Sequence, residues 1–308
     1  MEWLDTYESE LHVVFNEGKR ILADFPPPLN RYGMSYLERF DVFATGSRKN
    51  YICYLLPFWL RDEFSLDPET ARRMALGNVL CMLYFFLQDD AMDSGTVAVW
   101  QLPLANLLYA EFLNLYRPLF PAHSPFWAYC NRYLREWADS VTNEAEGDYF
   151  FKDRRRIAHK ASPLKLSGAA AMLLSGNNGL IEPLGQALDE TLIALQMLDD
   201  YEDWEADWHE GGYNCLLSLA AHSGQRSGSL LTQEYIRSYI YTFGGLSVYA
   251  DIAVARYREQ QETGQQFGRL SAFHRELVGN LRGIADAVEA EKNLLSRGGL
   301  EYYLAKFQ

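Results

Sequence analysis

Apolar residues recur every three or four positions along most of the chain, and the two-residue alternation of strands is scarce. This spacing puts apolar side chains on one face of a helix, so it predicts an all-α protein. Breaks at Pro and Gly clusters divide the pattern into these expected helices: 2–23, 34–44, 48–62, 68–92, 99–116, 124–146, 163–175, 178–208, 231–258 and 265–294. No linker or internal repeat interrupts residues 1–308, which are expected to form a single domain, a helical bundle.

Two of these helices are apolar on several faces and then become acidic at one end. The apolar run 80–87 leads into Asp89-Asp90-Ala-Met-Asp93, and the run 192–198 leads into Asp199-Asp200-Tyr-Glu-Asp203. A helix on the surface would instead carry charges along its whole length. The two acidic helix ends are therefore candidate functional sites.

Helical geometry stacks the carboxylates at each end. Residues four apart lie one turn above each other, so Asp199, Asp203 and Asp207 form a ladder, and Asp89 lies on one stripe with Asp93. Like charges at this spacing destabilise a bare helix by a few tenths of a kcal/mol per pair. Mg²⁺ would relieve the repulsion, because it binds one or two carboxylates and completes its shell with water and phosphate oxygens. The candidate metal ligands are Asp89, Asp90, Asp93, Asp199, Asp200, Asp203 and Asp207.

Two such stripes facing each other across a bundle would hold several ions and clamp a diphosphate, whose departure the metals would promote. The alternative is two solvated acidic helix ends. One D-D-x-x-D string arises by chance in about one chain of this length in twenty-five. Two strings, about 110 residues apart and each at the end of an apolar helix, are far rarer, which favours the metal interpretation.

The overall charge narrows the range of partners. Lys and Arg number 28 against 41 Asp and Glu, a formal net charge of −13, which argues against nucleic acid or an anionic membrane as partner. The densest basic stretch is 152–160, where Arg154, Arg155 and Lys160 are the candidate diphosphate ligands. Which arginine of 154–156 points inward stays open, as does the alternative of a solvated charged face. Small residues after Lys160 favour it, because they permit close approach.

Residues one and two turns before each acidic cluster are expected to line a hydrophobic cavity. Aromatic residues make up 14% of the chain, which suits such a cavity, and an ordinary bulky core is the alternative. The candidate cavity residues are Cys81, Tyr84, Phe85, Phe86, Leu192, Leu195 and Gln196. Tyr84 and Phe85 contribute bulky rings at this level.

The cysteines and the N-terminus bear on the compartment. The four cysteines are far apart and form no C-x-x-C pair, which favours reduced thiols and disfavours a zinc site. The acidic N-terminus does not have the pattern of a signal peptide, and no apolar run reaches 18 residues. A cytoplasmic protein with no transmembrane segment is expected.

At these residues the chain resembles the class I isoprenoid synthases along essentially its whole length. The resemblance rests on the D-D-x-x-D strings near residues 90 and 200, on the basic segment between them, and on Gln196, which stands before the second string as in trans-prenyltransferases. It implies a helical bundle around a central hydrophobic cavity, an isoprenyl diphosphate substrate, and three Mg²⁺ ions with bound diphosphate. It makes Asp89, Asp93 and Asp199 the catalytic residues, with Asp203 as a further leading metal ligand. A homodimer is left open.

Departures from the family pattern favour a terpene cyclase. Chain-elongating prenyltransferases place a pair of arginines after the first string and a lysine after the second, whereas here no Lys or Arg lies between Asp93 and Arg117 or between Asp207 and Arg226. A site without contacts for a second diphosphate can still ionise the first, and Asp199, Asp203 and Asp207 have the spacing of the metal-binding triad of microbial cyclases. The expected activity is cyclisation of a linear C15–C20 or longer allylic diphosphate. The alternatives are a short-chain trans-prenyltransferase, a head-to-head squalene- or phytoene-type synthase, and a helical scaffold without activity.

Overall fold

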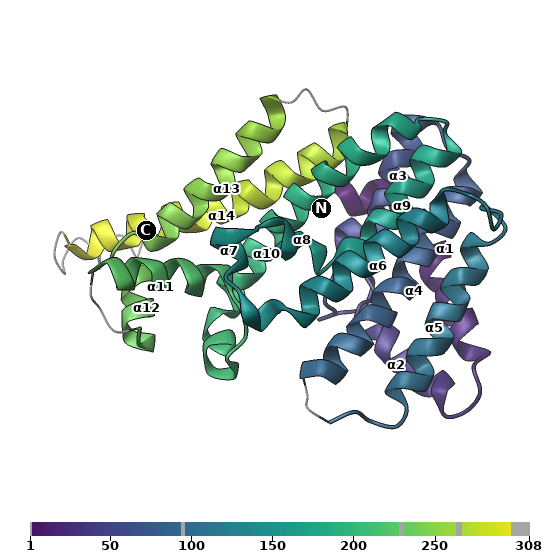
Figure 1. Ribbon diagram of the computed structural model, residues 1–308, viewed down its shortest axis with the longest axis horizontal. Coiled ribbons are helices and arrows are strands. Elements are labelled where there is room, and N and C mark those ends of the chain that lie inside the picture. The colour runs from purple at the N-terminus through teal and green to yellow at the C-terminus, as the bar shows by residue number, and fades with distance from the viewer. Residues whose placement is uncertain (1, 94–95, 228–230, 263–266, 297–308) are drawn as a thin grey trace. The chain divides into compact units, whose positions relative to one another are not determined.

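The computed structural model describes residues 2–93, 96–227, 231–262 and 267–296. Within these ranges the regular structure is entirely helical, which confirms the all-α prediction (Figure 1). The chain divides into two compact units, one made of 1–134 and 162–185 and the other of 135–161 and 186–308. The expectation of a single domain stays a prediction. Among the described helices, we find none with the length and apolar character needed to span a membrane.

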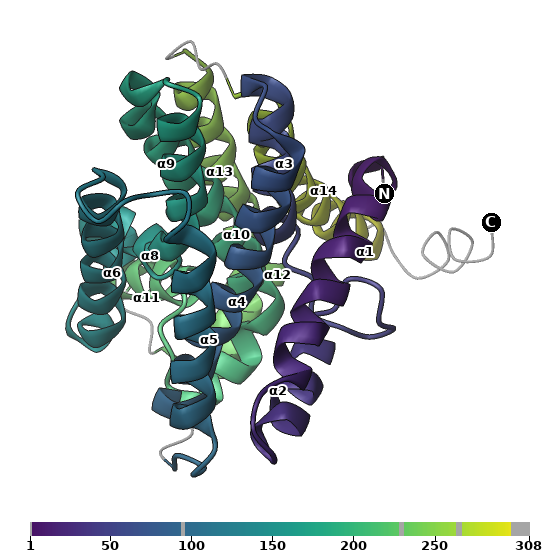
Figure 2. The same cartoon turned by 90° about the vertical axis from the view of Figure 1, so that its right-hand side faces the viewer.

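The first unit is built around α4 (Pro68–Asp93), which contacts α1, α3, α5 and α9 (Figure 2). Burial on all sides explains why α4 has no polar stripe: Met74, Val79, Leu80 and Leu83 are each fully buried although they point in different directions around the helix. The other helices of this unit are α1 (Glu2–Ala23), α2 (Leu29–Glu38), α3 (Tyr51–Phe64), α5 (Gln101–Tyr116), the first part of α6 (Phe126–Thr142), α9 (Lys165–Leu174) and the start of α10 (Ile181–Glu210), with 3-10 turns at Ser162–Leu164 and Asn178–Leu180.

Two residues of α4 set its distance from its neighbours. Gly77 lets α5 approach closely, because a Cβ atom at this position would lie 2.6 Å from the Tyr116 ring. Asn78 is buried, and its amide donates to the Cys53 carbonyl and the Ser167 hydroxyl, both at 3.0 Å. These contacts join α4 to α3 and α9, so the helix that carries the first acidic cluster is held on several sides.

The second unit contains most of α10 and the helices that come after it. Here α13 (Gly245–Glu262) and α14 (Gly268–Ser296) pack side by side, and α11 (Cys215–Ser227) contacts α12 (Gln233–Tyr241), α13 and α7 (Tyr149–Lys152) (Figure 1). The short helix α8 (Arg155–His159), a 3-10 turn at Glu144–Glu146 and the end of α6 complete the unit. The last three turns of α10 carry the second acidic cluster.

Helix boundaries depart from the prediction in both units. In the first unit the expected helix over 34–44 is wrong, because α2 begins at Leu29 and ends at Glu38. The expected helix over 231–258 is wrong, because α12 ends at Tyr241 and α13 begins at Gly245. Gly244 takes a φ of 78°, and a Cβ at Gly245 would collide with the Tyr239 ring. Close packing at this turn therefore overrides the continuous apolar spacing. Helix α11, which the pattern did not predict, begins directly after the Gly211-Gly212 break.

Candidate functional site

At the end of α4, the two adjacent aspartates have different surroundings. The Asp89 side chain is exposed, whereas Asp90 is half-buried and accepts hydrogen bonds from the Tyr36 hydroxyl at 3.0 Å and the Arg39 guanidinium at 3.4 Å. Burial, and then the negative charge of Asp90, raise the pKa of Tyr36, so this phenol stays a hydrogen-bond donor. Asp93 is the last residue of α4, and its side chain lies outside the described part of the structure.

Arg39 is a basic residue beside the first cluster that the sequence did not reveal. It comes directly after α2, and its guanidinium lies 4.9 Å from the centre of the Tyr36 ring and 5.6 Å from that of Phe40. It stands 51 positions before Asp90, whereas the family pattern places its arginines after the motif, so the sequence contained no signal for it. The side chains of the pair are 47% and 42% exposed, which keeps the interaction weak and leaves the arginine accessible to a ligand.

At the end of α10, three carboxylates succeed each other at one-turn intervals, as predicted. Asp199 and Asp203 are exposed and Asp207 is half-buried. Partial desolvation raises the pKa of Asp199, and the charges of Asp203, Glu202 and Asp207 raise it further. The mutual repulsion that the helical spacing implies is therefore present in the folded protein.

Asp200, next to this ladder, lies in the interior. Its side chain is 2% exposed, and its carboxylate accepts hydrogen bonds from the Cys215 amide at 2.6 Å and the Gln196 side chain at 2.7 Å. Burial raises the pKa of Asp200 to about 6, although both hydrogen bonds act in the opposite direction. The carboxylate thus joins α10 to the first residue of α11, and its oxygens already have protein partners.

Two amide side chains contact the ladder without adding charge. The Gln196 amide, predicted to line the cavity, also approaches Asp199 at 3.3 Å. The Asn214 amide donates to Asp207 Oδ2 at 2.7 Å and to the Asp200 carbonyl at 2.7 Å. Asn214 is a site residue that the sequence analysis missed, because its only local signal was its position before an unrecognised helix.

Lys160 is the basic residue of the 152–160 segment that acts on the ladder. Its charge lowers the pKa values of Asp199, Asp200 and Asp207, although other causes raise each of them more. Its ammonium group also lies 2.5 Å from a Glu144 oxygen. The fold therefore brings together the lysine and the acidic helix end that the sequence had placed 40 residues apart.

The three consecutive arginines have separate environments. Arg154 is half-buried over the Phe150 ring and donates to the Phe150 carbonyl at 2.5 Å. Desolvation lowers the pKa of Arg154, and the charge of Arg256 lowers it further. Arg155 is exposed at a hollow of about 200 Å³ that also contains the Arg256–Glu190 ion pair.

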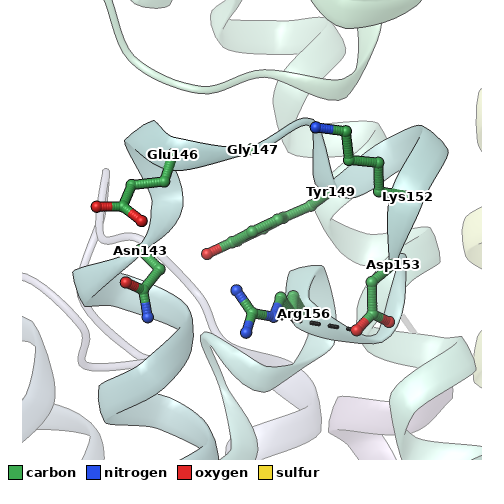
Figure 3. Close-up of a pocket in the computed structure, with 7 residues that line it drawn as sticks. All are labelled: Asn143, Glu146, Gly147, Tyr149, Lys152, Asp153 and Arg156. Atoms are coloured by element: carbon green, nitrogen blue, oxygen red, sulfur yellow. Dashed lines mark ion pairs between the residues drawn. The ribbon is translucent and has the colours of Figure 1, made fainter.

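Arg156 lines a larger hollow of about 490 Å³ (Figure 3). Its guanidinium also binds Asp139 at 2.8 Å. The same hollow is lined by Lys152, Glu146 and Asp153, so its two cations face two carboxylates. A balanced charge of this kind offers little attraction for a diphosphate. Among the predicted diphosphate ligands, Lys160 is the one whose charge acts on the ladder, and its role as a ligand stays a prediction.

The predicted cavity residues of α4 belong to an aromatic cluster inside the first unit. Tyr84 stacks on Tyr109 of α5 and meets Phe85 edge to face, whereas Phe86 packs against Phe40 on the other side. The remaining predicted positions are buried or half-buried: Cys81, Leu192 and Leu195. The ring contacts equally suit the alternative of an ordinary core, and the cavity stays a prediction.

The donor chemistry at the two helix ends suits a hard divalent cation, because exposed carboxylate oxygens are the ligands that Mg²⁺ takes from proteins. In the described residues, no group of three or more His, Cys, Asp or Glu side chains is already arranged to hold a metal ion. Carboxylates that bind one or two at a time, with phosphate oxygens completing the shell, do not require such a group.

No protein-family model matches the sequence, and comparison with curated proteins finds no match. Solved structures with a similar fold include a geranylgeranyl pyrophosphate synthetase from the archaeon Geoglobus acetivorans, with 16% identity and a TM-score of 0.61. They also include a polyprenyl synthetase from Streptomyces coelicolor A3(2), with 14% identity and a TM-score of 0.53. Each comparison covers 91% of this chain and 98% of the other. The chain therefore has the all-helical class I isoprenoid synthase fold that its aspartate motifs indicated.

Proposed function

We propose that this protein is a Mg²⁺-dependent enzyme that ionises an allylic isoprenyl diphosphate. The observation that carries the proposal is the Asp199, Asp203 and Asp207 ladder at the end of α10, with the Lys160 ammonium in electrostatic range. Mg²⁺ bound with the diphosphate would withdraw charge from the leaving group. Lys160 would hold a phosphate oxygen. Asp89 and Asp93, at the end of α4, are proposed as Mg²⁺ ligands because they offer the same carboxylate chemistry.

Two candidate functions differ in what happens to the substrate after it is ionised. Prenyl transfer to isopentenyl diphosphate, giving a longer linear chain, is the first candidate. The two structures named above are prenyl-chain synthetases by their descriptions. Arg39 also supplies a base beside the first aspartate motif, where the sequence after the motif has none. The comparisons therefore favour this alternative over cyclisation.

Cyclisation to a terpene hydrocarbon or alcohol is the second candidate. The observation in its favour is that no Lys or Arg lies between Asp93 and Arg117 or between Asp207 and Arg226. A cyclase needs to bind only one diphosphate, so it tolerates the loss of these bases.

The deciding experiment incubates the protein with Mg²⁺ and farnesyl or geranylgeranyl diphosphate, with and without isopentenyl diphosphate. Released pyrophosphate and the products, identified by mass spectrometry, are measured together. A longer diphosphate formed only with isopentenyl diphosphate supports prenyl transfer, whereas a hydrocarbon or alcohol from the allylic substrate alone supports cyclisation. A product joined from two allylic molecules identifies head-to-head condensation. The absence of Mg²⁺-dependent pyrophosphate release from every substrate would reject the proposal.

A further inference from the structure

Asn214 occupies the joint between the acidic end of α10 and the beginning of α11. It is 2% exposed, and both ends of its amide are bonded. Its oxygen accepts from the backbone amides of Leu216 at 2.9 Å and Leu217 at 3.0 Å, which is the geometry of a helix N-cap. Its nitrogen donates to Asp207 Oδ2 and to the Asp200 carbonyl, both at 2.7 Å.

The donor half of this amide goes beyond what a cap requires. An aspartate on a helix can point its carboxylate in several directions, and a bond to one oxygen selects one of them while leaving the other oxygen for a ligand. A neutral amide does this without cancelling the charge, whereas a lysine at the same place would compete with a cation. Removing a hydrogen bond that orients a metal-binding side chain typically weakens metal affinity 10–100-fold.

The start of α11, which carries the Asn214 amide, is held by hydrogen bonds to two other segments. Asp200, which accepts from Asn214 through its carbonyl, also accepts from the Cys215 amide through its carboxylate, so one residue of α10 binds two consecutive residues of the α11 start. A separate contact from the Ser218 hydroxyl to Asp148 at 2.7 Å joins α11 to the residue that caps α7. The α11 start is therefore a rigid support beside the ladder.

We infer that Asn214 is a positioning residue that holds the Asp207 carboxylate ready for a divalent cation, an inference that rests on the proposed Mg²⁺–diphosphate chemistry. Asn214 acts through Asp207 and need not touch the substrate. Its side-chain oxygen caps α11, and its side-chain nitrogen orients the Asp207 carboxylate.

Substitutions at Asn214 separate the two halves. Asn214→Ser keeps an oxygen that can cap α11, because serine and asparagine cap comparably, but its shorter side chain does not reach Asp207. Asn214→Asp keeps the shape and the cap but turns an oxygen towards Asp207, so it reports on the inference even where the serine variant does not fold. The matched control is Asn50→Ser, because Asn50 caps α3 through the Cys53 amide in the other unit.

The measurements are thermal unfolding, binding of Mn²⁺ in the presence of inorganic pyrophosphate by electron paramagnetic resonance, and the Mg²⁺ dependence of pyrophosphate release. We expect Asn214→Ser to weaken Mn²⁺ binding and raise the half-saturating Mg²⁺ concentration by about 10-fold, with a smaller change in kcat at saturating Mg²⁺. Asn214→Asp should weaken both further. Asn50→Ser should lower the Tm by a similar amount but leave metal binding unchanged.

Each outcome decides a separate question. Wild-type Mn²⁺ binding in both Asn214 variants, an equal loss in Asn50→Ser, or no Mn²⁺ binding by the wild type would overturn the positioning role. If the wild type binds Mn²⁺ with pyrophosphate but releases no diphosphate from any allylic substrate, the proposed function fails, and a selective loss of binding in the Asn214 variants still supports the positioning role.

Discussion

Asp90 and Asp200 occupy the same position of the same five-residue string, at the ends of α4 and α10. Asp90 is half-buried and shares a weak ion pair with Arg39 and a hydrogen bond with Tyr36. Asp200 is 2% exposed and holds the start of α11 through the Cys215 amide. In each string the first aspartate, Asp89 or Asp199, stays exposed.

The contrast shows that the first residue of the string is exposed at both helix ends, whereas the surroundings of the second residue differ. Exposed carboxylates at a helix end are accessible to a cation from the solvent, and the helical repeat alone puts them there. The next residue lies about 100° further round the helix, where it meets whatever packs against that side. On α10 that side packs against the start of α11, where the Cys215 amide donates to the Asp200 carboxylate. Asp200 therefore joins two helices.

The largest effect is expected where the two strings are alike. Asp89→Ala combined with Asp199→Ala should reduce Mg²⁺-dependent pyrophosphate release by more than about 100-fold, because it removes a proposed metal ligand from each cluster. Released pyrophosphate is the measurement, and Asp24→Ala, at an exposed position of the α1 end, is the control. Unchanged release in the double variant would remove the metal interpretation of both strings.

A large difference in stability should separate Asp200 from Asp90. At pH 5, below the pKa of Asp200, Asp200→Ala should lower the free energy of unfolding by about 1–3 kcal/mol, because it leaves the buried Cys215 amide without its acceptor. Asp90→Ala should cost less than about 1 kcal/mol, as exposed ion pairs do. Denaturant unfolding measures both, and equal losses would contradict the distinction.

The pH dependence of stability should report the buried charge of Asp200. Its folded pKa of about 6 lies above the ordinary aspartate value of 3.8, so its favourable contribution is present below about pH 4 and is lost as the pH rises through 6. The stability of the wild type relative to Asp200→Asn should therefore fall by at most about 3 kcal/mol between pH 4 and 7.

A second buried group titrates in the same range. Burial, and then the charge of Arg256, lower the pKa of His274 to about 4, so His274 destabilises the fold as the pH falls from 6.5. This contribution is present in both proteins and cancels in their difference. Parallel stability curves for the wild type and Asp200→Asn would show that Asp200 carries no buried charge.

The smallest expected effect concerns the lysine of the second cluster. Lys160→Gln should weaken binding of inorganic pyrophosphate with Mg²⁺ by about 10-fold, the loss of one charge-assisted hydrogen bond. Lys152→Gln, an exposed residue at the balanced hollow, is the matched control. Calorimetry measures both affinities. Equal losses in the two variants would show that only the net charge matters.

Much of the fold could be predicted because the determining signal is local. Helix α1 ends where the apolar spacing placed it, and α4 and α10 lie within a few residues of their predicted ranges. The split between α12 and α13 could not be predicted in this way, because it depends on the Tyr239 ring packing on Gly245. The start of α11 likewise depends on Asn214, a single polar residue.

The sequence by itself determined the all-helical class, the two acidic helix ends and the one-turn spacing of Asp199, Asp203 and Asp207, because each comes from the 3.6-residue repeat. Only the tertiary structure decided that Asp200 is buried, that Arg39 lies beside Asp90, and that Asn214 meets Asp207. The physical reason is one of range: a helix sets the geometry of residues four apart, whereas burial and hydrogen-bond partners come from segments that are brought together only when the helices pack.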